Sequence, residues 1–241
     1  MVQVPRRTGV SGPALVRLLT RLAHADISES GQSLADRLSL WLGWTDAIAL
    51  SAVLDSGAQA APAGAPASDS AEEDECARLR AALADAIDDD GTRARAPILR
   101  RGQPVVRETP PDTGTDYAPH RQRYLTLQQT METRIGQLRS RLRAILAGMP
   151  GMARLAMMDA VMDRSLGAHE RRLLATVPAL LESHFARLRQ AAQDAPDEPA
   201  TAAPAQWLAT FRQDMRSVLL AELDIRLQPV EGLLAALRDR P

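Results

Sequence analysis

The chain has 241 residues and a formal net charge of −1, and its 42 alanines and 33 leucines contrast with only seven aromatic residues. All 29 basic residues are arginine, and the absence of lysine and asparagine excludes a phosphate loop with its lysine, a Schiff-base lysine and an N-glycosylation acceptor. The single cysteine, Cys76, excludes an internal disulfide and favours a reducing compartment. Alanine and leucine favour helices over sheets.

The first 55 residues show three short helical patterns. Leucines spaced three or four apart predict a helix over 13–25, Ser33 is suited to cap a second helix that reaches Trp41, and Thr45 is suited to cap a third over 46–55. In the third helix we expect Ile48, Ala52 and Val53 to face inward. We therefore expect a small helical unit over 1–55, followed by a flexible Ala/Pro/Gly/Ser linker over 56–71.

Residues 72–192 contain the longest helical patterns. An acidic helix is predicted over 72–90, a loop rich in proline and glycine over 92–116, and long helices over 117–147 and 152–192, with Pro178 expected to kink or split the last one near Thr176. A short Met-Pro-Gly turn at 149–151 joins the long helices, which favours an antiparallel hairpin.

The C-terminal part begins with a Pro/Ala linker predicted over 193–205. Helices over 206–241 are expected to pack on the hairpin, and Pro229 is expected to break or restart the first of them after Leu227. The predicted fold is an all-α, elongated protein with a long antiparallel helical hairpin and short N-terminal helices. Apolar residues seven apart over 117–147 also indicate a coiled-coil pattern and make a homodimer an option.

Charge is unevenly distributed along the chain. Residues 69–90 carry nine acids and two arginines, whereas residues 91–143 carry eleven arginines and four acids. Three interpretations remain open: pairing between an acidic and a basic helix, a polar contact surface for a partner, and nucleic-acid binding. The last two would use a basic contact surface of Arg93, Arg95, Arg100, Arg101 and Arg107, although no aromatic residue for base stacking lies between these arginines.

No motif in the chain predicts catalysis, a cofactor or a metal ion. There is no Gly-x-Ser-x-Gly, Gly-x-Gly-x-x-Gly or His-Glu-x-x-His sequence, and the four histidines lack the Glu-x-x-His spacing of a di-iron bundle. Asp159 and Asp163 lie one helical turn apart and could bind a cation or serve acid–base chemistry, but with Arg154 and Arg164 nearby they favour an exposed charged face. We therefore expect no enzyme, although a helical enzyme without a known motif stays open.

The aromatic residues are the best candidates for partner binding. Trp41 and Trp44 flank Leu42 and Gly43, and Trp207 and Phe211 begin a second apolar stripe. Tryptophan is common both in small cores and at the centres of interfaces, so the sequence leaves both roles open for Trp41 and Trp44. For the stripe that begins at Trp207 and Phe211, core packing is favoured over a cofactor pocket, and partner binding by these two residues stays open.

Three stretches resemble an uncharacterised proteobacterial family of all-helical domains. They are 32–38 (QSLADRL), 41–47 (WLGWTDA) and Asp214-Met215 with 218–234 (VLLAELDIRLQPVEGLL). No motif of that family has a chemical role, so the resemblance implies no catalytic residue. It implies an accessory of an envelope complex, because such domains are encoded beside stator-type and outer-membrane-protein-A-like proteins, which is an association and not a mechanism.

The sequence as a whole favours a non-catalytic cytoplasmic helical scaffold or adaptor. Its partners would be other proteins, among them components of an envelope complex, or a second copy of the chain. No apolar stretch is long enough to insert into a membrane. The alternative function is an accessory nucleic-acid-binding protein that uses the arginine-rich segment 93–143.

Overall fold

The computed structural model describes residues 13–24, 36, 40–55, 69–89, 116–149, 151–194 and 203–239. These ranges form α1 (Ala14–Ala23), α3 (Trp44–Asp55), α4 (Asp69–Asp88), α5 (Ala118–Ala147), α6 (Ala153–Leu174), α7 (Val177–Gln193) and α8 (Ala203–Arg238). They contain no strand. The fold is all-α, as the composition predicts.

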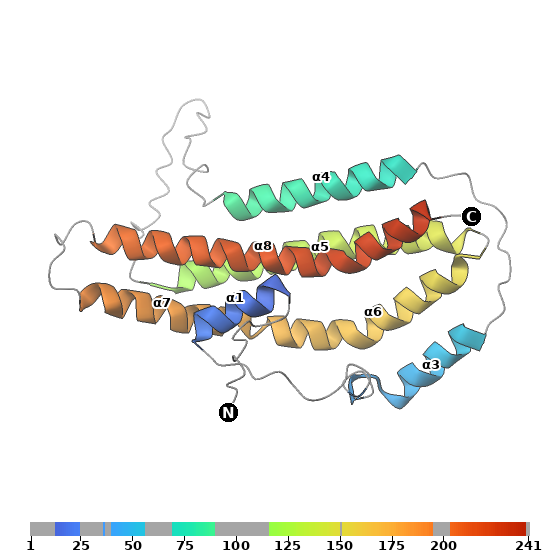
Figure 1. The fold of residues 1–241 in the computed structure, drawn as a ribbon, viewed down its shortest axis with the longest axis horizontal. Coiled ribbons are helices and arrows are strands. Elements are labelled where there is room, and N and C mark those ends of the chain that lie inside the picture. The colour runs from blue at the N-terminus through green and yellow to red at the C-terminus, as the bar shows by residue number, and fades with distance from the viewer. Residues whose placement is uncertain are drawn as a thin grey trace, which may run out of the picture.

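The helices form layers in an elongated molecule (Figure 1). α5 and α8 lie side by side in the middle, α4 covers them on one side, and α6 and α7, together with α1, cover them on the other. α3 is outermost and packs on α6. α8 packs closely on α1, α4, α5 and α7, whereas α6 packs closely on α5 and α3 only.

The predicted antiparallel hairpin is present, but its second arm is divided. α5 ends before Gly148, and Gly151, with a φ of 80°, turns the chain towards α6. α6 ends at Leu174 and α7 begins at Val177, with Pro178 in its first turn. Proline is tolerated there because the first N–H groups of a helix have no helical acceptor, so the split falls where the proline predicted it.

The prediction for the C-terminal part is wrong in two respects. α8 begins at Ala203, inside the predicted 193–205 linker, and it continues through Pro229 to Arg238 without a break. Leu227, Val230 and Leu233 are all buried around the proline, so apolar packing on both sides outweighs the hydrogen bond that the proline removes. α8 bends instead of ending, as Figure 1 shows.

The coiled-coil stripe of α5 is used inside the molecule. Tyr124 and Met131 have no exposed surface, and Leu138 is buried as well. They belong to one core that joins apolar residues of all the described helices except α3. A homodimer would therefore need another surface.

The described N-terminal helices are attached to different parts of the bundle. α1 buries Leu15 and Leu22 against α7 and α8, and the Arg187 guanidinium donates a hydrogen bond to the Leu22 carbonyl at the end of α1. α3 packs on α6. The helices of residues 14–23 and 44–55 thus do not pack together as the expected compact unit. Most of the helix predicted from Ser33 lies outside the described residues.

Candidate functional site

α3 carries an exposed apolar surface. The exposed fractions are 81% for Trp44, 53% for Ile48 and 47% for Leu54 on α3, and 73% for Leu40, which lies just before α3; we call these four residues the α3 apolar surface. None of the residues of α3 is buried. The expectation that Ile48 faces inward is therefore wrong, because α3 packs closely on α6 alone and leaves Ile48 exposed. A helix that is apolar on every side and stays at the surface is unusual for a monomer.

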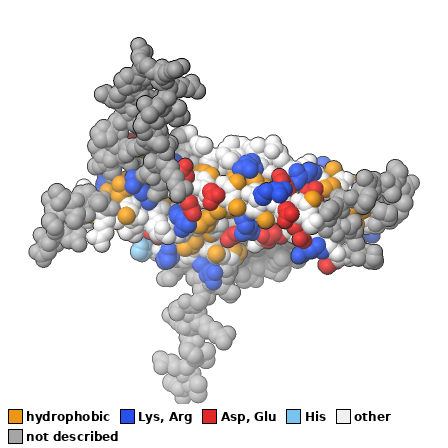
Figure 2. All heavy atoms as spheres, turned by 90° about the horizontal axis from the view of Figure 1, so that it is seen from above, with side chains coloured by type: hydrophobic (Ala, Val, Ile, Leu, Met, Phe, Trp, Pro, Cys, Tyr) orange, Lys and Arg blue, Asp and Glu red, His pale blue; other side chains and the backbone are white. Residues whose placement is uncertain are grey.

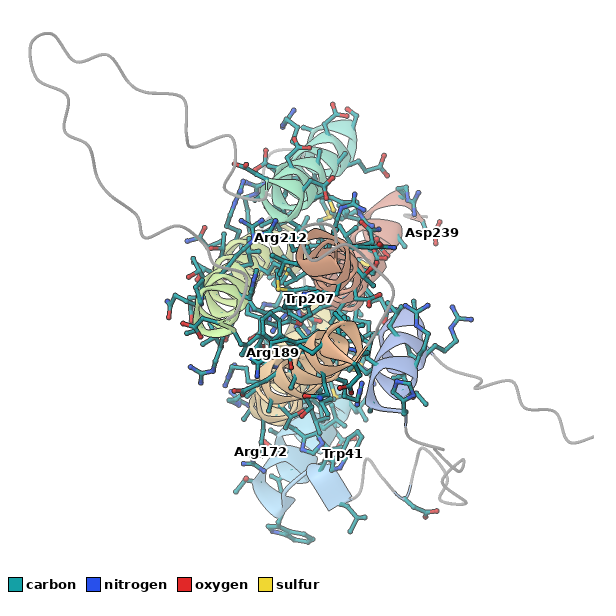
Figure 3. All side chains as sticks on the ribbon, turned by 90° about the vertical axis from the view of Figure 1, so that its left-hand side faces the viewer. Trp41, Arg172, Arg189, Trp207, Arg212 and Asp239 are labelled. Atoms are coloured by element: carbon teal, nitrogen blue, oxygen red, sulfur yellow. The ribbon has the colours of Figure 1, made fainter. Side chains whose placement is uncertain are left out.

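The four aromatic residues chosen from the sequence have different environments. Trp41 is half-buried and its ring lies 4.4 Å from that of His169 on α6, on the side of the bundle opposite α4 (Figure 3). Trp207 is half-buried and makes an edge contact with Phe185 at 5.0 Å, between α7 and α8 (Figure 3). Phe211 has no exposed surface, so the structure places it in the core and corrects its assignment as a partner-binding residue.

The acidic helix α4 forms ion pairs with arginines of two helices. Arg141 of α5 pairs with Glu72 at 2.9 Å, while Arg216 of α8 pairs with Asp88 at 2.5 Å. Acidic and arginine side chains lie next to one another along this face (Figure 2). Pairing within the chain, one of the three interpretations of the charge pattern, thus accounts for part of it. The basic contact surface from Arg93 to Arg107 lies outside the described residues.

The arginines in the described part of 93–143 mostly bind groups of the protein itself. The Arg123 guanidinium donates to the carbonyls of Ala86 and Ile87 at the end of α4. Arg139 and Arg143 bind carboxylates of α6. No observation on these residues favours nucleic-acid binding.

Asp159 does not belong to the exposed charged face that the sequence favoured, whereas the side chain of Asp163 is 40% exposed. Arg139 lies 2.7 Å from each of them, and Arg143 lies 3.2 Å from Asp159 and 2.8 Å from Asp163. The side chain of Asp159 is only 12% exposed. The correct partners come from α5, across the hairpin, and not from Arg154 and Arg164 on their own helix.

A buried polar cluster joins α5 to α8. Glu222 has no exposed surface, and its carboxylate accepts hydrogen bonds from the Tyr124 hydroxyl at 2.6 Å, the Gln128 amide at 3.0 Å and the Arg226 guanidinium at 2.9 Å. The Gln128 amide also donates to the carbonyl of Leu174, the last residue of α6. Burial, with the neighbouring negative charge of Glu222, raises the pKa of Tyr124 well above its usual range, so its hydroxyl stays a donor.

A charged cavity of about 210 Å³ lies beside this cluster. It is lined from α5, α6 and α8, and its lining contains equal numbers of acidic and basic side chains: Glu132, Asp163 and Glu170, with Arg139, Arg171 and Arg226. Two of the ion pairs across it are long, because Arg171 lies 3.4 Å from Glu132 and Arg226 lies 3.4 Å from Glu170. The cavity lies between α6 and α8, which do not pack closely on each other.

Three residues that are unfavourable inside helices also line this cavity. They are Gly136 of α5, Gly167 of α6 and Pro229 of α8. Relative to alanine, glycine costs a helix interior about 1 kcal/mol and proline about 3 kcal/mol. A Cβ atom added at Gly136 would meet no atom within 4 Å, so no close contact requires glycine there. Residues of low helix propensity on three separate helices thus meet at one place in the fold.

The other candidates from the sequence are structural in character. His184 is buried and its Nε2 lies 2.8 Å from Asp214 Oδ2, which links α7 to α8. Cys76 is buried and unpaired, and burial raises the pKa of its thiol, which disfavours a nucleophile. Within the described ranges, no group of three or more His, Cys, Asp or Glu side chains is placed to hold a metal ion.

Neither the buried polar cluster around Glu222 nor the charged cavity was predicted from the sequence alone. The available signals were an i, i+4 pair of Glu222 and Arg226 within an apolar stripe, and helix-breaking residues inside strongly helical segments. Neither signal shows which residues meet in space, so neither predicts a site without the fold.

The architecture is that of an all-α protein in which no described helix has the length and apolar character to cross a bilayer. The chain belongs to a protein family of unknown function (DUF3348), whose family model matches residues 1–239. No curated protein and no solved structure matches the chain. The family assignment agrees with the resemblance to an uncharacterised helical family and supplies no activity.

Proposed function

We propose that this protein is a non-catalytic cytoplasmic helical scaffold or adaptor that binds a partner protein through the α3 apolar surface. The observation that supports the proposal is the exposure of Trp44 and Ile48 on a helix without a buried residue, with Leu40 exposed just before that helix. Exposed apolar patches of this kind are typical of interaction sites, and tryptophan is enriched at interface centres. The cytoplasmic location rests on the single, unpaired cysteine.

The chemistry of α3 favours a basic, apolar partner segment. Asp46 and Asp55 are the charged residues of this helix, and it has no basic residue. Arginine or lysine beside apolar anchors would complement these carboxylates and could stack on the Trp44 indole. An amphipathic helix with basic flanks satisfies both requirements. Components of an envelope complex are the first candidates, because the family resemblance implies them.

The remainder of the molecule supplies rigidity. α3 packs on α6, and Trp41 contacts His169 on the same helix, so the surface is held on a long helix with a large core behind it. A docking element fixed to a rigid support loses less conformational entropy on binding than a free peptide does.

The experiment compares partner capture by the full-length protein and by the double variant Trp44→Ser/Ile48→Ser. Both positions are exposed, so we expect unchanged helicity and unfolding together with loss of capture. Val16→Ser is the matched control, because Val16 is also exposed, at 38%, but lies on α1. Removing residues 1–55 would be a poorer test, since it also removes the buried leucines of α1.

A photo-crosslinking residue at position 44 identifies what covers the surface. Crosslinks to a basic amphipathic segment of another protein support the proposal. Crosslinks to a second copy of the chain, with a dimer in sedimentation that Trp44→Ser dissociates, would replace it with self-association. Capture that the double variant leaves unchanged would overturn it.

A further inference from the structure

The charged cavity between α5, α6 and α8 has the composition of a binding site for a small molecule. Arg226 and Arg139 are mostly buried in its lining, at 8% and 14% exposed, whereas Arg171 and the three carboxylates are more open to solvent, at 37–56% exposed. A gap left by imperfect packing of a core is usually apolar and small. This cavity is instead charged, and its lining includes three residues that are uncommon in helix interiors: Gly136, Gly167 and Pro229.

The volume limits the size of the ligand. Pockets for drug-sized ligands have about 300–1,000 Å³. The cavity of about 210 Å³ is smaller and therefore suits a small metabolite. It opens between helices and is not enclosed, so a ligand has a route in from solvent.

The charges limit the chemistry of the ligand. Three carboxylates and three guanidiniums line the space, so a ligand of one sign would be attracted by one set and repelled by the other. The two long pairs, Arg171 with Glu132 and Arg226 with Glu170, leave hydrogen-bonding capacity on both partners, whereas the Arg139–Asp163 pair at 2.7 Å is tight.

We propose that this cavity binds a small zwitterion that carries a carboxylate and an ammonium group, with a free α-amino acid as the simplest member of the class. The carboxylate of the ligand accepts hydrogen bonds from Arg171 and Arg226, and its ammonium group donates to Glu132 and Glu170. Each long ion pair is thereby replaced by two shorter charge-assisted hydrogen bonds. Glu222 positions Arg226 for this contact, because its carboxylate binds the same guanidinium at 2.9 Å.

The test is calorimetric titration of the full-length protein with each of the common free L-amino acids, with acetate, inorganic phosphate and 1,4-diaminobutane as probes of a single charge sign. We expect saturable binding of one molecule per chain for at least one amino acid and at least tenfold weaker binding of the three other probes. Equal or tighter binding of acetate, phosphate or diaminobutane would overturn the zwitterion, and absence of amino-acid binding at millimolar concentration would overturn the site.

Two variants locate the binding. Gly136 lines the cavity and an added Cβ atom there meets no atom within 4 Å, so Gly136→Met adds bulk at the cavity without a clash and improves helix propensity; the protein should fold and bind at least tenfold more weakly. Arg171→Met removes one carboxylate-binding group and should have the same effect. Gly232→Met is the matched control, because Gly232 is a second glycine with open space, on α8 outside the cavity lining. Equal weakening by Gly232→Met, or none by Gly136→Met, would show that the amino acid binds elsewhere.

Discussion

α3 and α8 differ in a way that composition does not predict. α3 carries two charges in 12 residues and buries none of its side chains, whereas α8 carries eight charges in 36 residues, a slightly higher density, and supplies a large part of the core. α8 even buries Glu222 completely. The more apolar helix is thus outside, and the more polar helix is at the centre.

The difference shows that position in this fold follows from available partners. α8 is central because four helices pack on it. Its buried carboxylate, Glu222, is tolerated there because both carboxylate oxygens accept hydrogen bonds. Among the described helices α3 packs closely only on α6, and none of its side chains is buried. Its apolar character therefore favours a role in binding over a role in stability.

The largest expected effect comes from breaking the buried cluster of α8. Glu222→Ala leaves the Arg226 guanidinium buried without its main partner, so we expect the free energy of unfolding to fall by about 3–5 kcal/mol in urea denaturation. The double variant Glu222→Ala/Arg226→Met removes both charges and should recover most of that loss. A single variant with wild-type stability would show that the cluster contributes nothing to folding.

The aromatic residues allow the two helices to be compared directly. Phe211→Ala in α8 creates a cavity in the core and should lower the free energy of unfolding by about 3–5 kcal/mol. Trp44→Ala in α3 removes a side chain that is 81% exposed and should change it by less than about 0.5 kcal/mol. Similar losses for both variants in urea denaturation would mean that the outer side of α3 is packed in solution.

The sequence predicts the bounds of the hairpin helices well, and it predicts α8 and the contacts between helices poorly. The apolar stripe of α5 gives its bounds almost to the residue, and Pro178 marks the boundary of α6 and α7, because both signals are local. The behaviour of Pro229 depends on Leu227, Val230 and Leu233 being buried by other helices. The sequence pattern around a proline does not contain that information.

The candidate sites also depend partly on local sequence signals and partly on contacts that only the fold shows. Trp41 and Trp44 are visible in the sequence as unusual residues, but only the fold shows that Trp44 is exposed while Phe211 is buried. The cavity could not be predicted, since Gly136 and Pro229 are 93 positions apart in the chain and acquire a common role only where α5 and α8 meet. The ion pairs of Asp159 depend likewise on the register of the hairpin.

The pH dependence of stability tests how deeply the core tyrosines are buried. Burial, with the nearby negative charge of Glu182, raises the pKa of Tyr117 to about 12. A raised pKa means that folding favours the protonated phenol, so this stabilisation is complete below pH 10, the ordinary value, and is lost as the pH rises towards 12. The pKa of Tyr124 is raised as well, by burial and by Glu222.

Because the chain has only two tyrosines, their ionisation can be followed by tyrosinate absorbance. We expect no ionisation step near pH 10 in the folded protein and one step that coincides with loss of helicity at higher pH. In strong denaturant both residues should titrate near pH 10. A complete step near pH 10 with helicity retained would contradict the buried positions of both hydroxyls.

The last prediction compares the effects on stability of replacing two arginines of α5 that differ in exposure. Arg139 is 14% exposed and binds both Asp159 and Asp163, so Arg139→Ala should lower the free energy of unfolding by about 1–3 kcal/mol, because it leaves a nearly buried carboxylate with fewer partners. Arg141 is 47% exposed and pairs with Glu72 of α4, and Arg141→Ala should cost only about 0.2–1 kcal/mol. Salt should reduce the second loss more than the first, since solvent ions screen exposed pairs more strongly. Urea denaturation at two salt concentrations measures both, and a larger loss for Arg141→Ala would mean that α4 is held to the hairpin by its charges more than by its buried leucines.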